Sequence, residues 1–260
     1  MWLSDQLRVL MLLAGLAVLW TLESVWPLFR YEKHRWHRAW PNLALTALLV
    51  LTNLALAFVT AGVSRFSMNQ KFGLFFFFKM PFWLKGVLGV IALDLFTYWA
   101  HVLMHKSWFG WKFHRVHHTD KEVNVTTAFR QHPGETIWRV VWYLLAIAVF
   151  GIPMWVVALY LVLSTLNAQL EHTNVKLLEP LDRILRLMFV TPNMHKVHHS
   201  RKQIQTDSNY ANIFSVWDRI FGTYTATIDF RRLRYGLDGF DNESAQTLIA
   251  LLSTPFAKKV

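Results

Sequence analysis

The stretch IWRVVWYLLAIAVFGIPMWVVALYLVLSTLNAQL, residues 137–170, decides the fold that we expect for this chain. As one straight helix it would be about 50 Å long, well beyond a bilayer core of about 30 Å. Gly151 and Pro153 lie near its middle, where glycine loosens the backbone and proline removes a hydrogen-bond donor. The stretch therefore predicts a helical hairpin, 137–150 followed by 153–171, whose two ends return to the same face of the membrane.

Three earlier apolar runs are also long enough to cross a bilayer, at residues 7–29, 41–62 and about 81–104. The first has one arginine near its start and no cleavage site of small residues, so we interpret it as a retained helix and not as a signal peptide. The expected fold is all-α: a polytopic membrane bundle of about five membrane helices, the last two a hairpin, with a cytoplasmic histidine-rich helical cap. We expect one domain, residues 1–260.

The composition agrees with a membrane protein. Of 260 residues, 54% are hydrophobic, 13 are Trp and 20 are Phe, and Lys+Arg number 27 against 16 Asp+Glu. A basic soluble chain would suggest nucleic acid, whereas a basic, apolar, Trp-rich chain suggests loops that face anionic lipid, so no nucleic acid is expected. The absence of cysteine excludes disulfides, cysteine-ligated zinc and iron–sulfur clusters.

The charges of the loops predict an orientation. Residues 30–39 carry four Lys/Arg, residues 105–136 carry five, and the tail after residue 172 carries more than ten. The hairpin would place all three segments on one side, and the positive-inside tendency makes that side cytoplasmic. We therefore expect an integral, multi-pass protein whose histidines lie at the cytoplasmic side, with His34 and His37 contacting lipid head groups.

Histidine occurs twelve times, and most copies fall in three clusters: HVLMH at 101–105, HRVHH at 114–118 and HKVHH at 195–199. On a helix, positions i, i+3 and i+4 share a face, whereas the two rings of an HH pair cannot point the same way. One ring can serve one metal and its neighbour another, so the spacing suits two metals. The candidate ligands are His101, His105, His114, His117, His118, His172, His195, His198 and His199, with His132 as a further candidate.

These histidines have other interpretations. A lone histidine is usually a satisfied polar residue, but three clusters on one predicted side argue against chance. Imidazole sites suit zinc, copper, iron or nickel, and the residue types alone do not decide between them. A histidine-lined membrane carrier of zinc or iron would need ligands along several spans at mid-membrane depth. A zinc-dependent membrane hydrolase would need a general base such as the glutamate of HExxH, which this sequence lacks.

Six stretches carry a resemblance to a known family. They are LDLFTYWAHVLMH (93–105), WKFHRVHHTD (111–120), NVTTAFRQHPGE (124–135), QLEHTN (169–174), TPNMHKVHHS (191–200) and NYANIFSVWDRIFGTY (209–224). At these residues the chain resembles the fatty acid hydroxylase/sterol desaturase superfamily, whose members are integral membrane histidine-box di-iron oxygenases. The motifs are specific for the superfamily and uninformative about the substrate.

The resemblance implies O2-dependent oxidation of a lipid C–H bond, either hydroxylation or desaturation. It implies two iron ions (Fe2+/Fe3+) held by the boxed histidines and His172, with zinc as a substitute in purified protein. It also implies a membrane lipid substrate and a separate electron donor, a cytochrome b5-like or ferredoxin-type protein. The lipid, the carbon attacked and the oligomeric state stay open.

The chain departs from the family pattern beside His172. Relatives often place a partner histidine four residues away, where this chain has Ala168 and Lys176, so a ligand is missing or is supplied by a water that Asn174 or Asn167 holds. Asp94 lies seven residues before His101 in a membrane helix, where a carboxylate is costly. We expect Asp94 to accept the free ring N–H of a ligand histidine, with a protonated or Tyr98-paired carboxyl as the alternative. Asp218 and Arg219 are expected to form an ion pair.

Overall fold

The computed structural model describes residues 5–31, 35–226 and 233–257. These residues form helices and no strand, with three isolated β-bridges between loops. The predicted all-α fold is thus confirmed, while His34 lies outside the described residues. The helices of the bundle are α1 (Asp5–Val25), α2 (Arg35–Asn69), α3 (Phe82–Lys106), α5 (Pro133–Phe150) and α6 (Met154–His172).

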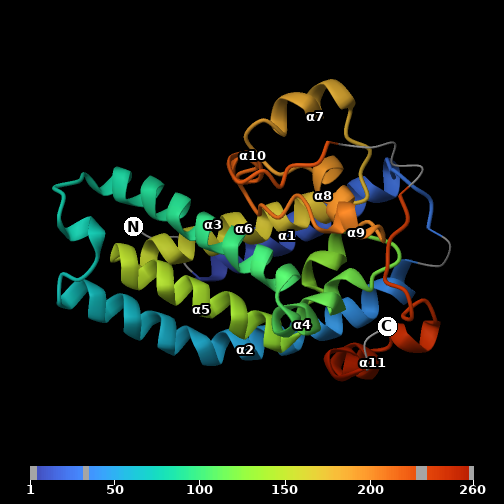
Figure 1. Ribbon diagram of the computed structural model, residues 1–260, viewed down its shortest axis with the longest axis horizontal. Helices are drawn as coiled ribbons and strands as arrows, with labels where there is room; N and C mark the ends of the chain where they lie inside the picture. The colour runs from blue at the N-terminus through green and yellow to red at the C-terminus, as the bar shows by residue number, and fades with distance from the viewer. Residues whose placement is uncertain (1–4, 32–34, 227–232, 258–260) are drawn as a thin grey trace.

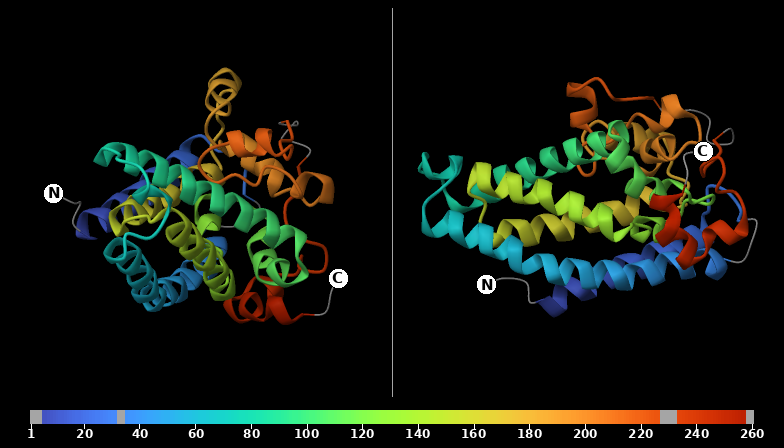
Figure 2. Two further views of the ribbon diagram at one scale, coloured as in Figure 1. Left: turned by 60° about the vertical axis from the view of Figure 1, so that its left-hand side comes forward. Right: turned by 60° about the horizontal axis from the view of Figure 1, so that its bottom comes forward.

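Shorter elements gather mainly at one end of this bundle. Figures 1 and 2 show the long helices side by side along the long axis of the molecule, with α4, α8 and α9 at one end and α7 projecting from its side. The short helices are α4 (Trp108–His118), α7 (Glu179–Leu185), α8 (Pro192–His198), α9 (Gln203–Thr206), α10 (Val216–Ile220) and α11 (Leu248–Ser253). The 3-10 turns are η1 (Leu74–Phe76), η2 (Val125–Phe129), η4 (Glu243–Gln246) and η5 (Thr254–Phe256).

Within the part of the chain that the structure describes, four helices are long and apolar enough to cross a membrane, namely α2, α3, α5 and α6. The first expected span appears as α1, in which Val9–Val25 is apolar. It ends before residue 29 because Pro27 disfavours helix at the residue before it. Helix α2 is longer than the apolar run 41–62, since backbone hydrogen bonding continues into the polar residues on both sides.

The predicted hairpin is present, as α5 and α6 meet at Gly151. Gly151 adopts a left-handed conformation with φ of 71°, which ends α5 and turns the chain into Pro153 at the start of α6. A side chain would not fit there, because a Cβ on Gly151 would lie 2.6 Å from the carbonyl oxygen of Phe72. The turn is also held by Ser64 of α2, whose hydroxyl donates to the carbonyl of Ile152 over 2.9 Å.

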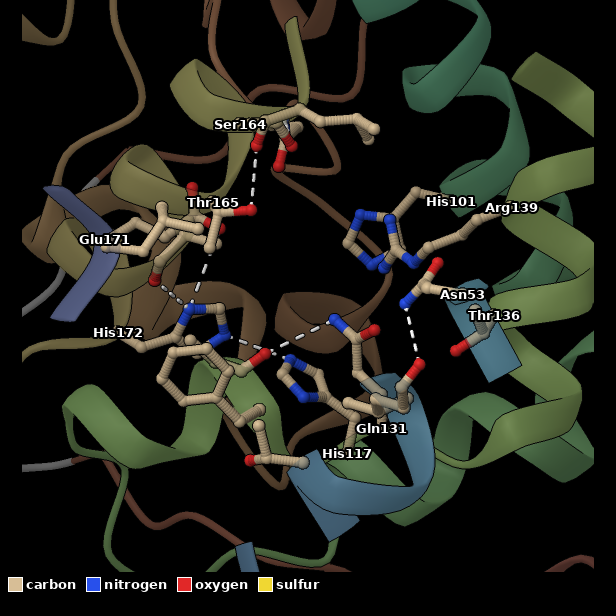
Figure 3. Close-up of a pocket in the computed structure, with 18 of the residues that line it drawn as sticks. Asn53, His101, His117, Gln131, Thr136, Arg139, Ser164, Thr165, Glu171 and His172 are labelled. Carbon is tan, nitrogen blue, oxygen red and sulfur yellow. Dashed lines mark hydrogen bonds and ion pairs between the residues drawn. The ribbon is translucent and has the colours of Figure 1, made fainter. Parts of the chain in front are cut away.

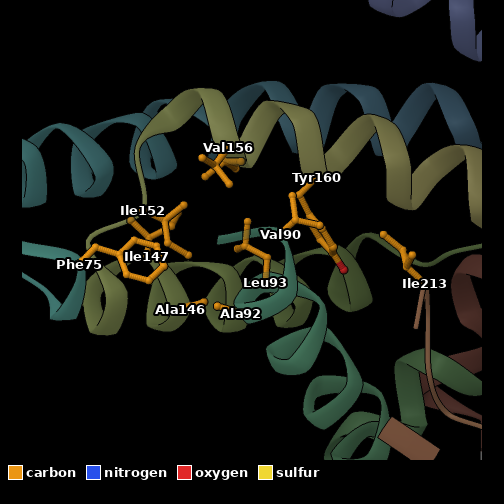
Figure 4. Close-up of a cluster of buried hydrophobic side chains, with 11 residues drawn as sticks. Phe75, Val90, Ala92, Leu93, Ala146, Ile147, Ile152, Val156, Tyr160 and Ile213 are labelled. Carbon is orange, nitrogen blue, oxygen red and sulfur yellow. The ribbon is translucent and has the colours of Figure 1, made fainter. Parts of the chain in front are cut away.

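The main hydrophobic core lies between α3, α5 and α6, toward the hairpin end (Figure 4). Leu93, Ile147 and Val156 come from these three helices and are fully buried. Gly89 allows α3 and α6 to approach, since a Cβ there would lie 2.7 Å from a methyl group of Val156. This packing fixes the two helices whose other ends carry His101, His105 and His172.

Candidate metal centre

Among the described residues, nine histidines with buried side chains converge at the end of the bundle opposite the hairpin turn, in two groups. The first group is His101, His105, His114, His118 and His198. The second group is His117, His172, His195 and His199. Within each group the ligand nitrogens all lie within 4.8 Å of one another. The structure thus brings together all the candidate ligands from the sequence except His132.

Helix geometry decides how neighbouring rings are divided. His117 and His118 are adjacent on α4 but belong to different groups, and so do His198 and His199 at the end of α8. Consecutive residues on a helix point about 100° apart, so an HH pair can reach two different centres. The separation that the HxxHH spacing predicts is therefore seen in both boxes.

Capping residues set the directions of the two short histidine helices. The hydroxyl of Ser107 caps α4 by accepting from the backbone N–H of Gly110 over 3.0 Å, which redirects the chain directly after α3. The hydroxyl of Thr191 caps α8 by accepting from Met194, and Pro192 occupies the first helical position. The starts of α4 and α8 are thus specified locally, by Ser107 and by Thr191 with Pro192.

The rings of each group face one another through Nε2. In the first group Nε2 of His114 lies 3.0 Å from Nε2 of His101 and 3.2 Å from that of His118. In the second group Nε2 of His172 lies 3.0, 3.0 and 3.1 Å from the Nε2 atoms of His117, His195 and His199. Two facing ring nitrogens can share one proton, but several that converge on one point cannot all be satisfied in this way. A divalent cation can accept all of their lone pairs at once.

The electrostatics keep these rings in the form that binds metal. For the six rings outside the membrane-spanning helices, burial lowers the pKa first and neighbouring histidines lower it further. A ring with a lowered pKa stays neutral, and neutral imidazole is the ligand form. Nε2 of His105 and of His198 are buried and have no hydrogen-bond partner among the described residues. The donor set therefore fits a metal ion at each group.

Backbone carbonyls orient three of the rings from the opposite nitrogen, Nδ1. Tyr210 binds His101 over 2.7 Å, Ser208 binds His198 over 2.8 Å, and Ala168 binds His172 over 2.6 Å. A carbonyl oxygen can only accept, so Nδ1 carries the proton in each ring. Nε2 is then left with its lone pair directed into the group.

Two carboxylates that the sequence motifs did not single out lie on the Nδ1 side of rings in the first group. Oε1 of Glu135 lies 3.1 Å from Nδ1 of His114, and Oδ1 of Asp207 lies 3.4 Å from Nδ1 of His105. Both carboxylates stand behind the ring and away from the converging Nε2 atoms. Glu135 is the last residue of NVTTAFRQHPGE, one of the stretches that carry the family resemblance. Its place in that stretch could have identified it.

The rest of that motif forms the wall beside α4. The side chain of Asn124 caps η2 in a reciprocal capping box with Thr127, and the Thr127 hydroxyl donates to Asp120 over 2.7 Å. Arg130 is fully buried and donates to the carbonyl of Val116, near the end of α4. The wall therefore holds the helix that supplies three of the nine rings.

His132 caps a helix and belongs to neither histidine group. Its Nδ1 accepts from the backbone N–H of Gly134 over 3.0 Å at the start of α5. Its ring packs against Phe113 with 5.2 Å between ring centroids. His132 is absent from both histidine groups, and its place at the helix start indicates a cap.

The structure also corrects the expected role of Asp94. Its carboxylate accepts from the backbone N–H groups of Ile213 and Phe214 and from the indole of Trp217, at 3.1, 3.0 and 2.9 Å. No histidine ring is among its hydrogen-bond partners in the described part of the chain. Asp94 acts instead on the segment 210–217, which carries the Tyr210 carbonyl that orients His101.

Asn174 and Asp218 likewise differ from expectation. The side-chain amide of Asn174 both donates to and accepts from the backbone of Phe29, so it ties the end of α6 to the loop after α1 and not to the histidines. Asp218 accepts from the backbone N–H groups of Tyr210 and Ala211, at 2.8 and 3.0 Å. Arg219 donates to the Ser215 carbonyl, so the expected Asp218–Arg219 ion pair is replaced by two separate contacts with loops.

A cavity of about 300 Å³ adjoins both histidine groups (Figure 3). His101 of the first group and His117, His172 and His195 of the second form part of its wall. The remaining wall is partly apolar, with leucines and valines of α1, α2, α5 and α6. Polar side chains also face it, and Figure 3 labels Asn53, Gln131, Thr136, Arg139, Ser164, Thr165 and Glu171.

Comparison with known proteins adds a family match. The sequence profile described as "Fatty acid hydroxylase" matches residues 86–223, slightly more than half of the 260 residues. The chain is 36% identical to human alkylglycerol monooxygenase over 156 residues, which is 60% of this chain and 33% of that protein. It is 28% identical to ornithine lipid hydroxylase OlsE of Rhizobium tropici over 182 residues, 70% of this chain and 53% of that protein.

A third relative is methylsterol monooxygenase 2-2 of Arabidopsis thaliana, 28% identical over 162 residues, 60% of this chain and 59% of that protein. The chain spans about a third of the length of the alkylglycerol monooxygenases that it matches. No solved structure matches significantly. The matched segment of the family profile contains every histidine of both groups.

Proposed function

The chain belongs to the fatty acid hydroxylase family, and from this premise we propose that it catalyses O2-dependent oxidation of a lipid C–H bond at a di-iron centre. The observation that carries the proposal is the placement of two buried histidine groups against one cavity inside an apolar helical bundle. Hydroxylation is favoured over desaturation, because relatives bear the names monooxygenase and hydroxylase. The whole of residues 1–260 would act as one membrane-embedded domain.

Each histidine group would hold one iron ion (Fe2+/Fe3+). Bound iron supplies the activation of O2 and the oxidising power that an unactivated C–H bond requires. The protein supplies nine neutral imidazoles and the carbonyls and carboxylates that orient them. Zinc binds such sites more tightly than ferrous iron does, so purified protein can carry zinc in place of iron.

The cavity would bind the part of the lipid that is oxidised. Its leucines and valines suit an alkyl chain, while Asn53, Gln131 and Thr136 can hydrogen-bond to a polar group of the same lipid. Because four ligand histidines form part of the wall, a bound C–H bond would lie close to both metals. Burial of the site also keeps bulk water away from the reacting atoms.

A substrate could enter from the bilayer between α2 and α6. Val50 of α2 and Leu161 of α6 line the cavity, yet they are 52% and 40% exposed. The wall at these positions is therefore one side chain thick. A lipid would need to displace only these side chains to reach the cavity laterally.

Electrons would come from a separate protein that docks at the histidine end. Lys106 and Lys202 are exposed there, in a chain with a net charge of +11. Complementary charge accelerates such docking, so we expect an acidic carrier of the cytochrome b5 or ferredoxin type. The positive-inside tendency would place this end, and the metals with it, on the cytoplasmic side.

Lipid analysis under isotopically labelled oxygen tests the proposal. Host cells with and without the protein would be grown under 18O2, and their lipids compared by mass spectrometry. We expect a lipid that gains one 18O atom as a hydroxyl group in cells with the protein; a new double bond that needs O2 would indicate desaturation. Unchanged lipids together with altered cellular zinc or iron would reject the oxygenase and favour a metal carrier.

A further inference from the structure

We propose that Glu171 is a carboxylate ligand of the metal at the second histidine group. The inference rests on the proposed function only in that it needs a metal at that group. The two groups differ in their donors, since the first has five histidines and the second has four. At four residues before and after His172 the chain has Ala168 and Lys176, which supply no imidazole. Glu171 is the carboxylate beside the second group, which has one histidine fewer than the first.

The position of the Glu171 carboxylate relative to His195 separates it from the other acidic residues nearby. Oε1 of Glu171 lies 3.7 Å from Nε2 of His195, the nitrogen that faces the centre of the group. Glu135 and Asp207 approach their histidines at Nδ1, on the far side of the ring. A carboxylate that only orients a ring belongs on the Nδ1 side. Oε1 of Glu171 also lies 3.7 Å from Nδ1 of His172, so it stands between the two rings and, unlike Glu135 and Asp207, also reaches a ring nitrogen that faces the metal site.

The separation between Glu171 and His195 suits two ligands of the same ion. Ligand atoms at about 2.1 Å from a metal lie roughly 3.0 Å apart when they are at right angles and roughly 4.2 Å apart when they are opposite. The observed 3.7 Å falls between these limits. The carboxylate lies outside the set of nitrogens that are mutually within 4.8 Å, so binding would draw it inward by a small rotation about its own side-chain bonds.

Glu171 is held in this direction by its other oxygen. Oε2 accepts from the side-chain amide of Asn167 over 3.1 Å, and the same amide donates to the carbonyl of Asn212 over 2.6 Å. Asn167 is four residues earlier on α6, so both side chains lie on one face of the helix. Oε1 is then left to face the cavity and the second group, and Figure 3 shows Glu171 beside His172 on the same wall.

The charge of Glu171 gives an independent reason for a nearby cation. The side chain is 4% exposed, near the end of a helix that is long and apolar enough to span the membrane. Its ion-pair partners among the described residues are His172 and His195, with no lysine or arginine within 4.0 Å. Arg139 acts on this carboxylate only from beyond that distance, whereas a metal ion between the carboxylate and the neutral imidazoles would place a positive charge directly beside it.

Carboxylate ligation would make the two centres chemically different. The first would have neutral ligands only, and the second would have one anionic ligand on the side of the substrate cavity. Loss of the Glu171 charge should therefore weaken one metal and leave the other in place. That asymmetry can be measured without any assay of lipid oxidation.

Metal titration of purified variants tests the proposal. Wild type, Glu171→Gln, Glu171→Asp and the control Glu179→Gln would be loaded anaerobically with 57Fe2+, challenged with a chelator, and examined by Mössbauer spectroscopy and by metal analysis. Glu179 is half-exposed on α7 and lies outside both groups, so its variant controls for the loss of one negative charge. In Glu171→Gln we expect one of the two irons to be lost at about tenfold lower chelator concentration and one spectral component to change. Glu171→Asp should fall between it and the wild type.

Two irons with unchanged affinity and spectra in Glu171→Gln would overturn the ligand assignment and leave the proposed function intact. A wild-type protein that binds no metal would overturn both. If Glu171→Gln fails to fold, an experimental structure of the zinc-loaded wild type decides the question. Oε1 at about 2.0–2.2 Å from the zinc supports the assignment, and a separation above roughly 3 Å rejects it.

Discussion

Oε1 of Glu135 lies 3.1 Å from Nδ1 of His114, and the same oxygen accepts from Nε and an Nη of Arg139 at 3.0 and 2.9 Å. One carboxylate oxygen thus connects a candidate ligand on α4 with an arginine one turn further along α5. All three residues are buried or nearly so. The orientation of His114, the ring that contacts both His101 and His118, therefore depends on a side chain that is not a ligand.

Glu135→Gln should weaken the metal at the first group. A neutral amide attracts the His114 ring less strongly than the carboxylate 3.1 Å away does, and it removes the negative charge beside Arg139. Substitutions behind ligand histidines typically cost 10–100-fold in metal affinity, and we expect about that loss. Chelator competition measures it, with Glu179→Gln as the charge control. Equal retention in Glu135→Gln and in the control would show that Glu135 does not support the site.

Single histidine substitutions should remove different metals. His198→Ala deletes a ring of the first group and His117→Ala a ring of the second. Each variant should keep about one metal per chain, and the double variant should keep little. Metal analysis by mass spectrometry, with detergent-solubilised protein checked for monodispersity, gives the counts. A full complement in the double variant would contradict the assignment of both groups.

Val50→Trp should impair substrate access without loss of metal. The larger side chain would fill the wall where Val50 lines the cavity. Leu54→Trp is a matched control. Leu54 lies one turn further along α2 and is similarly exposed, at 59% against 52% for Val50, but it does not line the cavity. We expect at least tenfold lower lipid oxidation in Val50→Trp, with wild-type metal content in both variants. Equal activity in the two would place the entrance elsewhere.

Cysteine labelling should confirm that the histidine loops share one side of the membrane. The chain has no cysteine, so each introduced thiol reports alone. Exposed positions are Lys106 before the hairpin, Lys176 after it, and Gln70 near the hairpin turn. Membrane-impermeant maleimide should label Lys106→Cys and Lys176→Cys from the cytoplasmic side and Gln70→Cys from the other. Labelling of the first two from opposite sides would be incompatible with a shared metal centre.

The Asp218 carboxyl should give stability an unusual dependence on pH. Burial raises its pKa to about 6, although Thr223, Ala211 and Tyr210 donate hydrogen bonds that oppose the shift. The native state then binds more protons than the unfolded state between pH 4 and 6 approximately, so the free energy of unfolding falls as pH rises across that window. The change is about 2–3 kcal/mol at most.

Asp218→Asn cannot titrate and should lack this decline. Thermal unfolding of metal-free protein at several pH values between 4 and 7 would compare the variant with the wild type, which cancels the contribution of the histidines common to both. The difference in stability between the two proteins should change by about 2–3 kcal/mol across the window. A constant difference would show that the Asp218 carboxyl titrates normally.

Much of the architecture follows from local properties of the chain. Runs of apolar residues determine which helices can lie in lipid, and Gly151 with Pro153 divides the last run, because both residues act on the backbone directly beside them. The separation of His117 from His118 follows from the angle between consecutive helical residues. These effects reach no further than one or two turns, so the sequence alone determines them.

Tertiary structure alone decided where buried polar side chains found their partners. Asp94 lies two turns before His101 on α3, which made a contact with a ligand ring plausible. The segment 212–217 instead packs against α3 and brings two backbone N–H groups and the Trp217 indole to that carboxylate. Glu135 and Glu171 reached the histidines in the same way, through packing between helices. Such contacts join residues far apart in the chain, and a hydrogen bond forms only where packing brings donor and acceptor within about 3 Å.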